Sequence, residues 1–500
     1  MRRFLNNLFR TILTTSKASE RNHSTRRARL QLHGLEDRMV LSSAATVGNI
    51  LSIGVSAGVS PAQIRTLTLT ELNAASKNPL IKVSDSVQGV LGQFPINQIA
   101  TYEIAVNGND NVTINDSQGF PTAPLPFANG SNIILISPQG AAGGTNNSFT
   151  LDGNVPLPSS ILETYTASPT SAAASTLAVD GLNFRISSAI SAVTDTIPLQ
   201  GGGVLVVNAS GSQNVTLTPQ ILADTQTLSG LGGGGGSTLT YANKNFIKLN
   251  ESAPSVTVTV NAPFATILEE GISVNTSGVG DDVVVAAAGV VTSVVTKGSG
   301  SEVLVQSNAA QVNVEGDSST NPTTTVVIGK SLGNNTDVTS GIQANVLVID
   351  AKTLDVANNG NDSTQEKVTV TQQSISGTGF FGNSSVVVNY GGVGVVNISG
   401  GQLANTYTVE ASSLNASFGS QINLNDDSDK FFAVNVDVDA RSGLDLDVIK
   451  RTLQATGEIN INAPAGKFTN QSDGDILVSF AGGLTSQIDN DGFTVSEEHS

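Results

Sequence analysis

The residues best suited to chemistry are the aspartates that follow two closely spaced glycines, in the run Ser277-Gly278-Val279-Gly280-Asp281-Asp282. The chain contains no cysteine, and its histidines are His23, His33 and His499, so residues 43–498 offer a metal only oxygen ligands. Oxygen ligands favour calcium over zinc or copper. We therefore expect any metal effect to be a calcium effect centred on Gly278, Gly280, Asp281 and Asp282, with the glycines forming a turn that aims backbone carbonyls at the ion.

This run resembles the calcium-binding RTX nonapeptide, Gly-Gly-x-Gly-x-Asp-x-apolar-x, and lacks only the first glycine. The resemblance implies aspartate carboxylates and backbone carbonyls as calcium ligands, with Asp282 as the motif aspartate. Partial copies occur at 108–112 and 360–363, and a more distant one at 400–409. In that family each ion is shared between successive tandem turns, whereas these copies look isolated. The alternative is that Gly-x-Asp simply makes tight turns between strands.

A second acidic set contains Asn435, Asp437, Asp439, Asp445 and Asp447, preceded by further carboxylates at 426–429. Alternation with valines places the first three on one face of a strand. Like charges there repel unless a cation or protons intervene. The set predicts a cation site, or the acid/base pair of a β-helical enzyme that cleaves polysaccharides without histidine. The alternative is a solvated outer face that keeps a strand edge from aggregating.

Composition narrows the classes of protein. Residues 1–42 carry a net charge of +6 and the remainder a net charge of −23. So acidic a body argues against nucleic-acid binding, which needs a basic face. The missing cysteine excludes disulfides and thiolate nucleophiles, and the missing body histidine excludes a Ser-His-Asp triad there. Aromatic residues make up only 4%, so the core must use β-branched and small residues, which suit thin stacked β-layers.

The basic leader ends in Leu35-Glu36-Asp37-Arg38-Met39-Val40-Leu41-Ser42. This segment resembles the LEPR-XLL motif, which follows basic leaders in large exported proteins of planctomycete-type bacteria; Asp37 is an accepted variant, and Val40 replaces a leucine. The resemblance implies an extracytoplasmic destination, secreted or at the cell surface, and no enzymatic activity. We expect residues 1–45 to be a disordered export leader. The uncharged stretch 39–62 is too mildly apolar for a stable transmembrane anchor.

The body repeats short runs of alternating polar and β-branched residues, such as Ser255-Val256-Thr257-Val258-Thr259-Val260, which indicate half-buried strands. Apolar runs such as Val283-Val284-Val285 and Val386-Val387-Val388 indicate burial on both faces. The frequent asparagines at turn positions suggest side chains stacked from coil to coil. The sequence predicts an all-β fold, and we favour a right-handed parallel β-helix or β-solenoid over a multi-domain β-sandwich. Residues 61–76 and 446–455 are candidate helices. Strand centres between 255 and 315 are expected near Val258, Ile267, Val274, Val284, Val294, Leu304 and Val312.

Composition shifts suggest domain boundaries. An Ala/Ser/Thr/Pro stretch at 166–176 and the glycine run Gly232–Ser237 have the composition of linkers. We predict an export leader at 1–45, an N-terminal β-rich region at 46–165, a second β-rich region at 176–231 and a regular solenoid-like region at 238–498.

The expected function is that of an exported, non-enzymatic structural or adhesive protein at the cell surface or in a matrix. Its expected partner is a cell-surface polysaccharide or a matrix protein, with no nucleic acid, no catalytic residues and no cofactor apart from calcium. One alternative is a β-helical polysaccharide lyase or hydrolase that uses the carboxylates at 426–447. The other is a calcium-dependent adhesion module. The sequence indicates no oligomeric state.

Overall fold

A computed structural model of the chain describes residues 43–400, except 55–63, 73–77, 107–109, 117–131, 139–146, 154–161, 170–173, 180–181, 188–189, 199–202, 210, 212–213, 221–224, 233–237, 264–270, 318–320, 330–337, 362 and 372. Beyond residue 400 it describes the backbone of the strands alone. Of the predicted leader at 1–45, residues 1–42 lie outside the described residues, whereas Ser43–Ala45 are paired with a neighbouring strand. Two long sheets and the short pairing of β35 with β37 contain the described strands.

The larger sheet, called sheet A, contains β1 (Ser43–Val47), β2 (Ile50–Gly54), β6 (Thr101–Val106), β8 (Asn132–Pro138), β10 (Leu162–Thr166), β11 (Ser175–Val179), β12 (Leu182–Ile186), β14 (Val204–Ala209), β18 (Phe246–Glu251), β20 (Gly271–Thr276), β22 (Thr292–Thr296), β24 (Val312–Glu315), β26 (Val346–Ile349), β28 (Lys367–Thr371), β29 (Ser374–Thr378), β30 (Val387–Gly391), β32 (Thr406–Glu410), β34 (Asn435–Asp439), β36 (Ile459–Asn462), β38 (Ile476–Phe480), β39 (Leu484–Ile488) and β40 (Ser496–Glu497).

The second sheet, called sheet B, contains β3 (Arg65–Leu72), β4 (Leu80–Asp85), β5 (Gly89–Pro95), β7 (Asp110–Asp116), β9 (Asn147–Gly153), β13 (Ile190–Asp195), β15 (Val215–Gln220), β16 (Thr225–Ser229), β17 (Thr238–Tyr241), β19 (Thr257–Ala262), β21 (Asp282–Ala288), β23 (Glu302–Val305), β25 (Thr325–Ile328), β27 (Thr353–Ala357), β31 (Val395–Gly400) and β33 (Gln421–Asp426). The remaining elements are β35 (Leu446–Lys450), β37 (Phe468–Gln471) and the 3₁₀ turn η1 (Ile96–Gln98).

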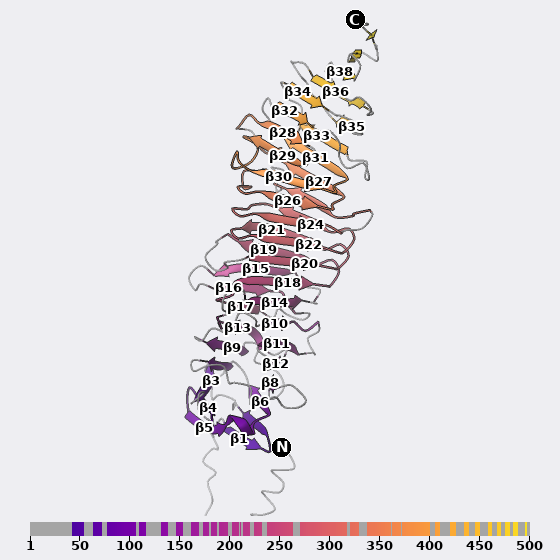
Figure 1. Cartoon of the computed structure of the whole chain (residues 1–500). Helices are drawn as coiled ribbons and strands as arrows, with labels where there is room; N and C mark the ends of the chain where they lie inside the picture. Colours follow the sequence, from indigo (N-terminus) through magenta and orange to yellow (C-terminus); the bar gives the residue numbers. More distant parts are fainter. Residues whose placement is uncertain are drawn as a thin grey trace, which may run out of the picture. The chain divides into compact units, whose positions relative to one another are not determined.

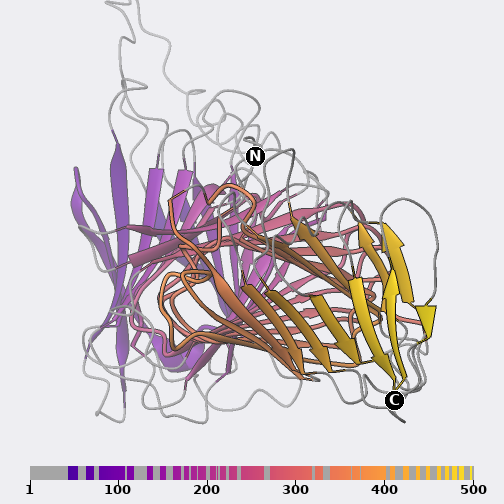
Figure 2. The ribbon, with the colours of Figure 1, turned by 90° about the horizontal axis from the view of Figure 1, so that it is seen from above.

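The chain alternates between the two sheets. From β18 to β27 each strand of one sheet is followed by a strand of the other, and each pairs in parallel with the next strand of its own sheet. We call one strand of each sheet a circuit. The shortest circuits take 20 residues, as in the pairing of Ile272 with Thr292. Strands adjacent in the ladders carry adjacent colours in Figure 1, and in Figure 2 neighbouring strands are turned slightly against each other, as sheet twist requires.

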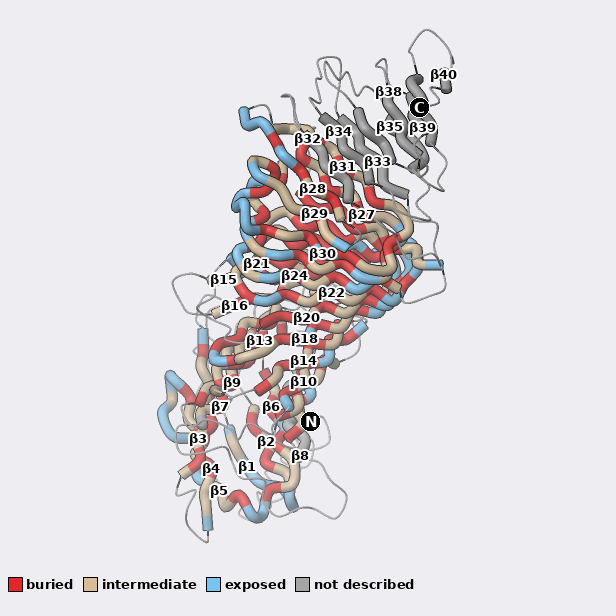
Figure 3. Tube along the Cα trace, turned by 45° about the horizontal axis from the view of Figure 1, so that its top comes forward, coloured by how far each residue is buried: buried red, intermediate tan, exposed pale blue. Residues whose placement is uncertain are grey.

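One hydrophobic core runs through the described circuits. Side chains alternate between buried and partly exposed along the strands, as in Thr257–Ala262 and Leu80–Asp85, and Figure 3 shows this alternation in red and tan. The inward residues of both sheets belong to a single buried cluster made largely of Val, Ile and Leu. The run Val283-Val284-Val285 is buried on both faces, because Val284 packs with Leu304 and Val327 in a second cluster. The predicted double burial is confirmed for this run, whereas in Val386-Val387-Val388 the middle residue is only half-buried.

Three antiparallel meanders interrupt the parallel ladders. Strands β10–β12 lie between β8 and β14 of sheet A, and β15–β17 lie between β13 and β19 of sheet B. Each meander adds two strands to its own sheet. Because the first lies in sheet A and the second in sheet B, the two sheets gain the same number of strands. The third meander, β28–β30, lies between β26 and β32 of sheet A. Sheet B has no added strands at that level in the described chain, because β31 pairs directly with β27 and β33.

The predicted all-β class is confirmed, and no α-helix occurs among the described residues. The predicted strands near Val258, Val274, Val284, Val294, Leu304 and Val312 are present, whereas Ile267 lies outside the described residues. Both candidate helices are wrong, because 65–72 and 446–450 are strands β3 and β35. In β3 the inward Leu67 and Leu69 alternate with Thr66, Thr68 and Thr70, a period of two.

The regions predicted as separate domains share both sheets. Strand β10, before the first proposed linker, pairs with β14 after it. Strand β13 pairs with β17, on the far side of the glycine run at 232–237. That run joins the antiparallel strands β16 and β17 of a meander, so its glycine content is that of a hairpin connection.

Candidate functional sites

The predicted Gly-Asp turn connects β20 to β21. Asp281 is fully buried, and its Oδ1 accepts a hydrogen bond from the Val256 backbone N–H at 3.3 Å. The Asp281 carbonyl accepts the Glu302 N–H at 3.0 Å, which ties this turn to the next circuit. Asp282 is exposed at the start of β21. The two aspartates therefore lie in different environments, and the oxygens of Asp281 alone point into the protein.

The turn is repeated 20 residues later. The Gly-Asp turn is therefore not isolated, contrary to the prediction from the sequence. Gly298 and Gly300 occupy the positions of Gly278 and Gly280, and Ser301 stands in place of Asp281. Gly280 and Gly300 have φ values of +70° and +72°, which glycine adopts without strain. A Cβ at Gly298 would collide with the Gly278 carbonyl. The glycines are thus required by the conformation and close stacking of the turns, whether or not an ion binds.

Two buried carboxylates interact at this turn. Oε1 of Glu251, at the end of β18, accepts the Ser252 and Ala253 N–H groups at 2.8 Å each. Burial raises the pKa of Glu251, the two N–H donors oppose that shift, and the Asp281 carboxylate adds to it. Glu251 Oε2 and Asp281 Oδ2 have no hydrogen-bond partner. These two oxygens are therefore the carboxylate atoms at this turn that could bind a metal. The described residues contain no group of three or more acidic or histidine side chains that could hold a metal ion.

The other predicted acidic sites are only partly described. In the first partial copy, Asp110 donates its backbone N–H to Asn147 Oδ1 at 2.9 Å, and residues 108–109 lie outside the described residues. Asp362 of the second copy also lies outside them. Asn435, Asp437 and Asp439 lie on β34 of sheet A, and Asp447 lies on β35. The side chains of 426–447 are not described, so the predicted convergence of these carboxylates stays a prediction.

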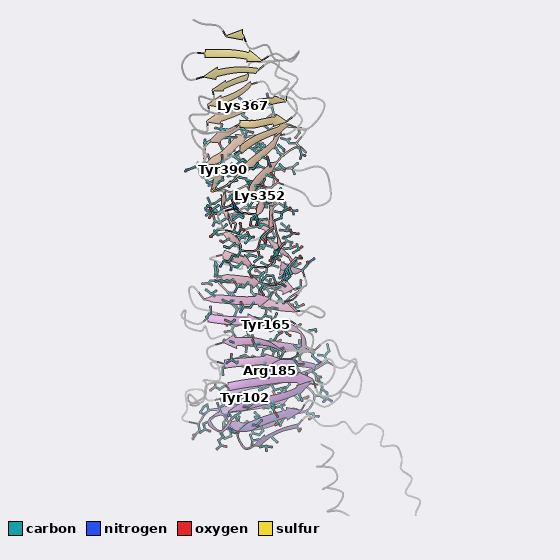
Figure 4. All side chains as sticks on the ribbon, turned by 90° about the vertical axis from the view of Figure 1, so that its right-hand side faces the viewer. Tyr102, Tyr165, Arg185, Lys352, Lys367 and Tyr390 are labelled. Carbon is teal, nitrogen blue, oxygen red and sulfur yellow. The ribbon has the colours of Figure 1, made fainter. Side chains whose placement is uncertain are left out.

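A buried charge cluster formed by Lys244, Glu163 and Asp195 was not predicted from the sequence. Lys244 Nζ lies 2.5 Å from Glu163 Oε2 and 3.1 Å from Asp195 Oδ2, and all three side chains have no solvent exposure. Glu163 lies on β10 of sheet A, Asp195 ends β13 of sheet B, and Lys244 follows β17. Tyr165, two residues after Glu163, marks this level in Figure 4. The one sequence signal is Lys244 itself, the sole Lys or Arg between Arg185 and Lys248.

A pocket of about 430 Å³ lies beside the third meander. Within its lining Asn358 Nδ2 and Asn361 Nδ2 donate to Glu366 Oε1 at 2.6 and 2.9 Å, and the rings of Phe380 and Phe381 meet edge to face at 4.9 Å. Both amides are therefore bonded within the protein. The lining residues are Val338, Ser340, Asn358, Gly360, Asn361, Ser363, Thr364, Gly379, Phe380, Phe381 and Gly382.

Stacked asparagines link successive circuits on the outer face of sheet A. Asn275 Nδ2 donates to Asn250 Oδ1 at 3.0 Å, Asn250 Nδ2 donates to Asn208 Oδ1 at 2.8 Å, and Asn208 Nδ2 donates to Thr166 Oγ1 at 3.3 Å. Asparagines are therefore stacked between neighbouring circuits, but on strands β14, β18 and β20 rather than at the predicted turn positions. The amides of Asn208 and Asn250 are each held by the circuits on both sides.

No protein-family model, curated protein or solved structure matches this chain. Among the described residues, no helix has the length and apolar character needed to span a bilayer.

Proposed function

We propose that this chain is an exported, non-enzymatic structural or adhesive protein whose body is a β-solenoid, with each circuit forming one coil. The observation that carries the proposal is the outer face of sheet A, where short polar side chains repeat in register. Lys248, Ser273, Ser293 and Asn313 form one such column beside the asparagine column. A regular array of amides and hydroxyls suits an extended polymer with a repeating pattern of hydroxyl groups, so a cell-surface polysaccharide is the proposed partner.

Co-sedimentation with cell-surface polysaccharide tests the adhesive role. The Ser273→Glu/Ser293→Glu variant should bind more weakly, because two carboxylates interrupt the hydroxyl column. A matched variant, Thr216→Glu/Thr259→Glu, places two neighbouring carboxylates on sheet B and should bind like the wild type. Equal loss in both variants, or no binding by the wild type, would contradict this role. Release of reducing ends from the polysaccharide would favour the enzyme alternative instead.

Export is tested separately by N-terminal sequencing of protein recovered outside the cytoplasm. The proposal expects a new N-terminus near residue 43, at the start of β1, since the charge changes sign there. Recovery from the cytoplasm alone would contradict export.

A calcium-dependent adhesion module is the second candidate, supported by the unpartnered oxygens of Asp281 and Glu251. Calcium should raise the melting temperature of the wild type, and EDTA should lower it, because an ion between the two carboxylates would offset their repulsion. The Asp281→Asn variant should lose the response, whereas Asp282→Asn should keep it, because Asp282 is exposed. This order reverses the one expected from the motif alignment. An unchanged melting temperature in EDTA would reduce the turn to a structural one.

A further inference from the structure

We propose that Lys244 and Asp195 form an intramolecular isopeptide bond between Nζ and Cγ, with Glu163 as the acid–base residue that promotes it. The inference goes beyond the proposed function and does not depend on export or adhesion. It rests on the juxtaposition of an amine and two carboxyl groups inside the core, far from solvent.

The geometry assigns a different role to each group. Asp195 Oδ1 accepts the Ile197 backbone N–H at 3.2 Å, which polarises the carboxyl group and would stabilise negative charge on that oxygen. Asp195 Oδ2 instead lies 3.1 Å from Lys244 Nζ. The amine is fixed by a hydrogen bond from Nζ to the Ile197 carbonyl at 2.7 Å. Glu163 accepts no backbone hydrogen bond in the described structure, so Asp195 is the better electrophile.

Burial favours the reactive protonation states. Charged groups are costly to bury inside a protein unless they are paired. Burial raises the pKa of Glu163 well above its usual range, the Asp195 carboxylate adds to this, and the charge of Lys244 opposes it. Glu163, 2.5 Å from Nζ, is therefore able to hold a proton and pass it between the amine and the leaving oxygen.

The reaction balances without a co-reactant. A proton moves from the Lys244 ammonium to the carboxyl pair, and the neutral Nζ attacks Cγ of protonated Asp195. Glu163 takes a second proton from Nζ and delivers one to Oδ2, the Cγ–Oδ2 bond breaks, and Oδ2 leaves as water. The products are an amide and one water molecule, and Glu163 ends as it began. Held geometry of this kind is equivalent to about 10⁵–10⁸ M of reactant.

The bond would join two sites on either side of the second meander. Asp195 ends β13, and Lys244 follows β17, its parallel neighbour. The segment between them includes β14–β17, so the cross-link would close a long loop and restrict the unfolded chain, as a disulfide does in other proteins. The chain contains no cysteine, so an amide is a covalent staple open to it.

Mass spectrometry of the purified full chain tests the proposal. The wild type should weigh less than its sequence by one water molecule. Asp-N cleaves before Asp224, the sole aspartate between Asp195 and Lys244, and should leave the two flanking peptides joined through these residues. The Lys244→Arg variant should show the full mass, and Glu163→Ala should show the full mass or a large unlinked fraction. Lys248→Arg, a change at an exposed lysine, is the matched control and should retain the link.

The wild-type measurement decides the question even if a variant fails to fold. Full mass in folded wild type would overturn the proposal and leave a buried ion pair. A missing water that maps elsewhere, including a link from Lys244 to Glu163, would also overturn it. Linked peptides from wild type and Lys248→Arg, together with separate peptides from Lys244→Arg, would establish the bond.

Discussion

The stretch β10–β17 and the stretch β18–β25 use the same two sheets but different interiors. The first contains two meanders, its core includes the large side chains of Tyr165, Phe184 and Tyr241, and the Lys244 cluster lies at its end. The second has plain parallel circuits and a core dominated by valine. Regular circuits can be stabilised by repetition of small β-branched residues. Where the repeat is broken, specific long-range contacts replace it.

The largest expected effect belongs to the irregular stretch. The Lys244→Met variant removes the amine that lies between two buried carboxylates and that the proposed cross-link joins to Asp195, so it should destabilise the protein by at least about 3–5 kcal/mol. Urea unfolding followed by circular dichroism measures this change. The exposed Lys248→Met is the control and should change stability by less than about 0.5 kcal/mol. A similar small change at Lys244 would mean that this cluster does not stabilise the meanders.

The regular stretch should be most sensitive at its stacked turns. In Gly298→Ala the new methyl group collides with the Gly278 carbonyl, so we expect a loss of about 1–3 kcal/mol. Gly300→Ala has the strained φ of +72° but meets no atom within 4 Å, so it should lose about 1 kcal/mol. Urea unfolding of both variants separates close approach from backbone conformation. Equal losses would show that the turns are not closely stacked.

The buried carboxyl group of Glu251, at the end of β18, predicts that the stability of the protein depends on pH. The pKa of Glu251 is raised in the folded protein, so the stability that its protonated form contributes is complete below the unfolded value of about 4.3 and decreases as pH rises through the folded value. The Glu251→Gln variant keeps an oxygen for Ser252 and Ala253 but does not titrate. The melting temperature of wild type minus that of the variant should therefore fall as the pH rises above about 4.3, the unfolded value. A rise over that range would contradict the assignment.

The smallest expected effect is at the outer asparagine column. Asn250→Ala removes one donor and one acceptor between neighbouring circuits and should cost about 0.5–1.5 kcal/mol. Ser273→Ala, on the adjacent strand β20, is the matched control and should cost less. If both changes are equal, the column contributes no more than ordinary surface contacts.

Local pattern was enough to predict the strands, because alternation in runs such as Thr257–Ala262 reports which face is buried. It was not enough for residues 61–76, where Pro61 at a first-turn position suggested a helix but the alternating Leu67 and Leu69 belong to strand β3. The Gly-Asp turn was visible, whereas its tandem copy was hidden by Ser301. The Lys244 cluster could not be predicted, since its acids are 49 and 81 residues away and meet it through the meanders alone.

The central structural claim is that residues 20 apart occupy neighbouring strands of sheet A. Because the chain lacks cysteine, pairs of introduced cysteines can test this register without competing disulfides from native residues. Ser273 and Ser293 are paired residues on adjacent parallel strands, about 4.8 Å apart, within the Cα separation that a disulfide bridges. The Ser273→Cys/Ser293→Cys variant should oxidise to an intramolecular disulfide, whereas Ser273→Cys/Asn313→Cys, two strands apart, should stay reduced. A disulfide in the second variant and none in the first would contradict the stacked circuits.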